Sequence, residues 1–149
     1  MNPLLRNIIA AVLGYVVMFA VAFGLFSLMW AVLGADGSFA PGSWEVSGAW
    51  IASSIALGVM VSVAGGFACS KMAASPQGVA ILVGLVIVFG ILAAMPDAQV
   101  ASTVRPEGVS MFDSMSGAVM PMWLTLLNPV IGVFAVMYGA RLERGRGDA

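Results

Sequence analysis

The polar residues near the centre of the last apolar stretch are Thr125, Asn128 and Pro129. Proline has no N–H, so the carbonyl of Thr125 loses its helical partner and a kink is expected there. The Asn128 amide lies where water is scarcest, so we expect it to face the bundle and to bond Ser54 or Ser62. A structural role predicts that Asn128→Leu lowers thermal stability. The other interpretation is a ligand or ion site made from the amide and the freed carbonyl.

A second pattern is a row of small residues at an unbroken spacing of four: Ser54, Gly58, Ser62, Gly66 and Ser70. Residues four apart share one face of a helix, so the row predicts a groove that lets another helix backbone approach closely. Such a groove favours a right-handed crossing of about −40°. Three uses are open: packing within the chain, recognition of a second subunit or second copy, or a polar path lined by the serines.

Several kinds of chemistry have little support in the composition. The chain has no histidine and a single cysteine, Cys69, so a metal site or a nucleophilic site has few candidate ligands. Methionine sulfur suits Cu(I), but it is also a common filler of apolar contacts. Five of the eleven methionines gather towards one side of the membrane: Met95, Met111, Met115, Met120 and Met122. We predict no cofactor, no metal site and no catalytic residue.

The elements that position these residues are long uncharged stretches. The 149-residue chain is 61% hydrophobic and 9% charged, whereas soluble domains are about 45 to 50% apolar and about 25% charged. Four stretches free of Asp, Glu, Lys and Arg predict spans at about 7–34, 48–70, 77–95 and 117–140. Each has roughly the 20 residues that cross a bilayer. We therefore predict one domain, 1–149, an all-α integral membrane four-helix bundle.

The basic residues at the span ends lie mainly on one side of the membrane. With the N-terminus inside, the cytoplasmic set is Arg6, Lys71, Arg141, Arg144 and Arg146. Only Arg105 falls outside, so the positive-inside rule predicts that both termini are cytoplasmic, N-in and C-in. The four tryptophans support this topology, because all fall near the outer surface, where indole rings prefer to lie.

The loop before the fourth span carries a short amphipathic pattern. Val109, Phe112 and Met115 are three apart, which predicts a short helix on the membrane surface or against a partner. The first and third spans carry neither a row of small residues nor a mid-membrane amide. We expect these two spans to be lipid-facing supports.

These observations favour a small multi-pass membrane protein that is not an enzyme. The first hypothesis is an accessory subunit or self-associating scaffold, whose partners are the lipid bilayer and either a second copy or another membrane protein. The alternative is a small homo-oligomeric transporter or channel, but the spans lack the charged residues that transport sites usually carry. The net charge of −1 gives no support for a nucleic-acid partner. The expected location is a cell membrane, the bacterial inner membrane.

Overall fold

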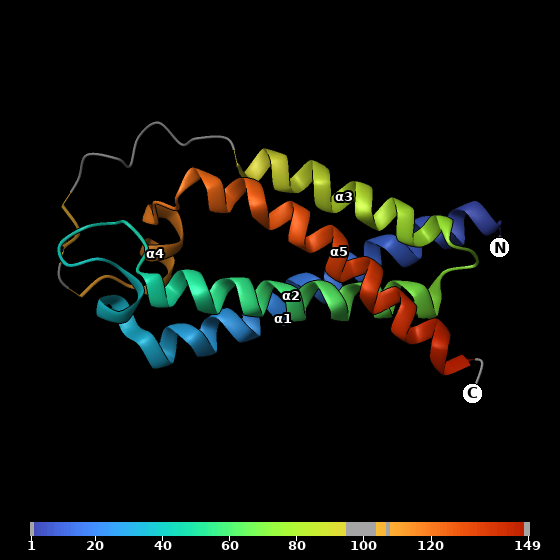
Figure 1. The fold of residues 1–149 in the computed structure, drawn as a ribbon, viewed down its shortest axis with the longest axis horizontal. Coiled ribbons are helices and arrows are strands. Elements are labelled where there is room, and N and C mark those ends of the chain that lie inside the picture. Colours follow the sequence, from blue (N-terminus) through green and yellow to red (C-terminus); the bar gives the residue numbers. More distant parts are fainter. Residues whose placement is uncertain (1, 95–103, 107, 148–149) are drawn as a thin grey trace.

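A computed structural model describes residues 2–94, 104–106 and 108–147. The described chain is helical, which confirms the all-α prediction. Its helices are α1 (Pro3–Ser38), α2 (Gly48–Met72), α3 (Gln77–Ala93), α4 (Met111–Gly117) and α5 (Met122–Gly147). Figure 1 shows α1, α2, α3 and α5 side by side as a bundle, with α4 across one end.

Three of the helices, α1, α2 and α5, are long and apolar enough to cross a membrane. The fourth predicted span is α3, which is also apolar but has only 17 residues. That length lies at the lower limit for a transmembrane helix, about 17 to 25 residues. The chain is therefore a membrane protein built as a bundle of three long apolar helices and a shorter fourth one.

The first helix extends beyond its predicted end. Gly34 has φ of 60°, a left-handed value that glycine adopts without strain, and it interrupts the helix at the predicted boundary. One more helical turn then forms up to Ser38, whose hydroxyl donates to the Gly34 carbonyl at 2.6 Å. The sequence prediction assigned this turn to the loop, because its glycine and aspartate are typical of turns.

The predicted start of the fourth span, at residue 117, is wrong. Gly117 is the last residue of α4, the short helix expected in this loop, and α5 begins only at Met122. Between them the chain is extended, and Val119 pairs with the segment before α2 through the Trp44 carbonyl at 2.8 Å. The α5 helix also runs past residue 140, because the tail contains good helix formers.

The α2 helix is central to the bundle. It packs mainly on α1 and α5, while α3 packs on α1 and α5. The start of α1 and the end of α5 lie at one end of the bundle, and α4 lies at the other (Figure 1). We call these the terminal end and the α4 end.

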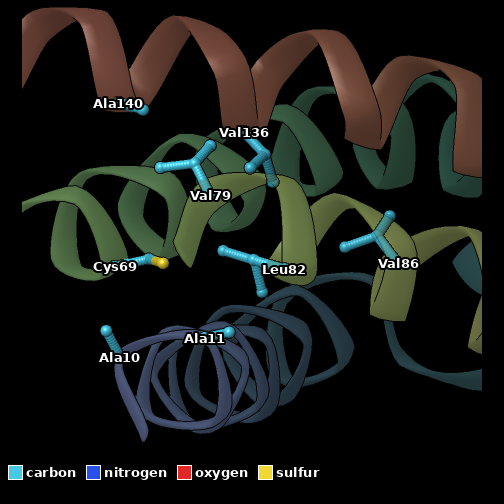
Figure 2. Close-up of a cluster of buried hydrophobic side chains, with 8 residues drawn as sticks. All are labelled: Ala10, Ala11, Cys69, Val79, Leu82, Val86, Val136 and Ala140. Atoms are coloured by element: carbon cyan, nitrogen blue, oxygen red, sulfur yellow. The ribbon is translucent and has the colours of Figure 1, made fainter. Parts of the chain in front are cut away.

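The buried core lies towards the terminal end and is built from α1, α2, α3 and α5. Figure 2 shows its eight small and medium side chains, which come from all four helices: Ala10, Ala11, Cys69, Val79, Leu82, Val86, Val136 and Ala140. The expectation that the first and third spans only support the bundle from the lipid side is wrong. Both α1 and α3 place residues in this core, because α1 packs on α2 and α3, and α3 packs on α1, α2 and α5.

Candidate functional site

The closest contact between α2 and α5 involves two glycines. A Cβ added to Gly66 would overlap the Val136 backbone, with the Val136 Cα only 2.8 Å away. A Cβ added to Gly139 would overlap the Val63 backbone in the same way. Each glycine therefore lets the other helix touch its backbone, which is the usual role of small residues where membrane helices cross.

The opposite side of α2 has a similar contact with α1. A Cβ on Gly14 would lie 2.8 Å from the Cys69 Cβ and 3.1 Å from the Gly65 carbonyl oxygen. A Cβ added to Gly65 would in turn lie 3.0 Å from the Gly14 carbonyl oxygen. Sequence reasoning missed Gly14 and Gly65. The available signal was the Gly65-Gly66 pair, because neighbouring residues point about 100° apart on a helix and so serve two different neighbours.

The row of small residues predicted on α2 meets α5 at most of its positions. Ser54, Ser62 and Gly66 are buried, and the half-buried Ser70 donates to the Glu143 carboxylate at 3.3 Å. Gly58 is different, because a Cβ added there would meet nothing within 4 Å. The structure thus uses this face inside the chain and leaves it open at one step of the row.

The residue opposite Gly58 follows from the register of the two helices, which run in the same direction (Figure 1). A Cβ on Gly132 would lie 3.6 Å from the Ser62 hydroxyl, and Gly66 meets Val136, so the facing residue numbers differ by 70 in both cases. The same step of 70 from Gly58 reaches Asn128. We call this place, defined by Gly58 and Asn128, the Gly58–Asn128 opening.

The expectation that Asn128 bonds Ser54 or Ser62 is wrong. The Asn128 side chain is exposed, and the structure gives its amide no hydrogen bond to any described residue. The Ser54 hydroxyl instead donates to the Ile51 carbonyl of its own helix, at 2.9 Å. Asn128 lies on an exposed face of α5, so the close contact of α2 and α5 at their glycines does not bring its amide to either serine.

The neighbours of Asn128 have partners of their own. The Thr125 hydroxyl donates to the Met122 carbonyl at 2.8 Å, and the α5 helix continues through Pro129. The Pro129 ring packs on α3, where a Cβ on Gly90 would lie 2.8 Å from the Pro129 Cβ. The three residues singled out in the sequence therefore do not form one site. Asn128 alone presents unused polar atoms.

The chemistry available at the opening is hydrogen bonding by a neutral amide, which has two N–H donors and one acceptor oxygen. No cluster of three His, Cys, Asp or Glu side chains that could hold a metal ion occurs among the residues described. The opening can therefore hold another helix or a polar group, and it has no group that would transfer protons or attack a substrate.

A second polar residue, Asn7, was not predicted to have a role, although it is almost fully buried. Its Oδ1 accepts from the backbone N–H groups of Ala74 and Ser75, at 2.9 and 3.1 Å, and its Nδ2 donates to the Ser75 hydroxyl at 2.8 Å. These bonds hold the turn between α2 and α3 against α1. The sequence signal was helical spacing, because Asn7 shares a face with Ala10, Ala11 and Gly14.

Comparisons with protein-family models, curated proteins and solved structures gave no match to this chain.

Proposed function

We propose that this chain is a non-enzymatic membrane protein that acts by self-association, with two copies meeting at the Gly58–Asn128 opening. The observations that support this proposal are the exposed amide of Asn128 on the apolar helix α5 and the open space at Gly58, which the register of the two helices pairs with it. Leaving an amide without a hydrogen-bond partner in hydrocarbon is unfavourable, so this position favours a contact that supplies a partner.

A second copy of the chain offers such a partner. An amide is self-complementary, so two Asn128 side chains related by a two-fold axis can each donate to the other. The open space at Gly58 would let the neighbouring backbone come close, as small residues do where membrane helices associate. The proposal thus keeps one function for the row of small residues on α2: most of the row packs inside the chain, and Gly58 is left for the partner.

Transport through a polar path has less support. The hydroxyls of Ser54 and Thr125 donate to carbonyls of their own helices, so they are not free to line a path. The spans also carry no ionisable group at mid-membrane, as the sequence shows. We further propose a location in the bacterial inner membrane, and the distribution of basic residues supports an orientation with both termini in the cytoplasm.

The test compares the association of fluorescently labelled copies in lipid vesicles at low protein-to-lipid ratio, by energy transfer. Asn128→Leu should weaken the dimer by about 5- to 150-fold, because interhelical hydrogen bonds in membranes contribute about 1 to 3 kcal/mol for a reciprocal pair. Thr125→Val is the matched control on the same helix. It should leave association unchanged, since the Thr125 hydroxyl is bonded within α5.

Folding and association can be separated in this experiment. Asn128→Leu should leave the thermal stability of the monomer unchanged, because the structure gives the amide no bond to the described chain. The intact particle from native membranes should have the mass of two copies. A monomer, or an Asn128→Leu protein that associates as well as the wild type, would refute the proposal. A complex with a different protein would favour the accessory-subunit function instead.

A further inference from the structure

A cavity of about 280 Å³ lies at the α4 end of the bundle. Aromatic side chains form most of its wall: Phe19, Phe23, Phe26, Trp30, Phe39 and Trp50. A cavity of about 150 Å³ can hold benzene, and small-molecule pockets usually measure about 300 to 1,000 Å³. The volume therefore suits a segment of one apolar chain, and it is too small for a whole lipid.

The wall of the cavity is apolar, and its aromatic rings pack against one another. Trp50 packs against Phe26 and Trp30, with ring centroids 6.0 and 6.4 Å apart. The hydroxyl in the lining belongs to Ser114 of α4, and it already donates to the Ser110 carbonyl at 2.9 Å. A polar solute would find little to bind inside, whereas a hydrocarbon chain would find a surface of matching chemistry.

Two buried hydrogen-bond donors lie near this cavity, one on a lining residue and one beside a lining ring. Within the described residues, the buried side-chain nitrogens that lack an acceptor are Trp50 Nε1 and Arg105 Nε. Trp50 lines the cavity, and the Arg105 guanidinium lies 5.5 Å from the ring centroid of Phe39, which also lines it. Buried polar groups are normally bonded, so two donors without an acceptor make this end of the bundle a place where acceptor oxygens would be favourable.

The buried arginine is poorly neutralised by the protein. The Arg105 side chain is only 7% exposed, and its charge partner is Asp36, 3.1 Å away and 99% exposed. An exposed carboxylate is well solvated and screened, so it attracts the guanidinium only weakly. The charge of Arg105 is therefore only weakly compensated by Asp36, and it lies beside the cavity wall at Phe39.

The order of these groups matches the order of groups along a membrane lipid. Arg105 lies against Phe39, and Phe39 lies 6.3 Å from Trp30, measured between ring centroids. From Trp30 the wall continues along α1 to Phe19, eleven helical residues or about 16 Å. That length is about half of the 30 Å hydrocarbon core, so the cavity follows one leaflet from a charged end to an apolar end.

We propose that this cavity binds an anionic phospholipid. Its phosphate oxygens accept from Arg105, and one acyl chain fills the aromatic cavity. The bound lipid would act as a structural ligand that joins α4 and the segment of Arg105 to the ends of α1 and α2. This proposal is independent of self-association, because none of the cavity residues belongs to the Gly58–Asn128 opening.

The test is native mass spectrometry of the full chain released from detergent with added phosphatidylglycerol. Arg105→Gln should lower the affinity about tenfold or more, because it removes a charge-assisted hydrogen bond. Asp36→Asn should raise retention, since it frees Arg105 from its competing carboxylate. Lys71→Gln, which removes an exposed charge at the terminal end, is the matched control and should have no effect.

Two further measurements show which parts of the lipid are bound. Ala22→Phe, which fills the cavity from α1, should block binding while leaving Arg105 in place. Diacylglycerol, which has the chains without the phosphate, should be retained much less than phosphatidylglycerol. Equal retention of the two lipids, or no response to Arg105→Gln, would overturn the proposal, and so would binding of palmitate in place of phosphatidylglycerol. The Asp36→Asn gain guards against misfolding as an explanation, because a damaged protein would not bind more.

Discussion

The contact between α2 and α5 can be tested by adding one methyl group. Gly66→Ala places a Cβ 2.8 Å from the Val136 Cα and carbonyl carbon, whereas ordinary contacts of this kind are 3.4 to 4 Å. The added Cβ on the α2 backbone meets backbone atoms of Val136, so no side chain can rotate away to make room. The two helices must separate locally, and the neighbouring core contact of Val136 loosens with them.

The expected loss in the free energy of unfolding follows from the type of steric clash. Overpacking a close contact costs about 1 to 3 kcal/mol. Replacing glycine by alanine in a helix also brings a gain of about 0.5 to 1 kcal/mol, because the unfolded chain loses freedom. A control with the same gain is Gly84→Ala in α3, where an added Cβ meets nothing within 4 Å. The free energy of unfolding of Gly66→Ala should therefore lie about 1 to 3 kcal/mol below that of Gly84→Ala.

The assay is stepwise unfolding of the purified protein in mixed detergent micelles, followed by tryptophan fluorescence. A second substitution checks the geometry: Gly139→Ala meets the Val63 backbone in the same interface. Combined with Gly66→Ala it should cost less than the sum of the two, because the helices have already separated. If Gly66→Ala proves as stable as Gly84→Ala, the two backbones are not in contact and the argument fails.

Two other predictions concern the ends of the bundle. Asn7→Ala should lower the free energy of unfolding by about 1 to 3 kcal/mol, because it leaves two backbone N–H groups of the α2–α3 turn without their acceptor. Faster trypsin cleavage after Lys71 would show the loosened turn, and unchanged cleavage would contradict this role. At the α4 end, the hydroxyl and then the backbone N–H of Ser110 donate to Asp113 and lower the pKa of its carboxyl. The cap therefore stabilises α4 at neutral pH and is lost as acid takes the pH through that lowered pKa, below the ordinary value of about 3.9. Ser110→Ala should raise the pKa of Asp113 in an NMR titration, and an unchanged titration would exclude the hydrogen bonds as its cause.

The sequence alone was sufficient for the fold class because the solvent of this protein is lipid. Hydrocarbon requires long uncharged stretches and backbone groups that bond within their own segment, so the helices are visible without any knowledge of their packing. Spacing along one helix is equally local. It was enough to mark Gly66 and Ser62 as members of one α2 face, and both are buried in the structure.

What only the tertiary structure decided is which neighbour each face meets. Asn128 was expected to bond Ser54 or Ser62, but its side chain is exposed, whereas α2 and α5 make their closest contact at Gly66 and Gly139. The position of a contact along two helices depends on their crossing, which involves residues far apart in the chain. The same is true of Asn7, whose partners lie near residue 75. Local spacing defines a face, and the packing of the whole bundle determines whether that face is buried or left for a partner.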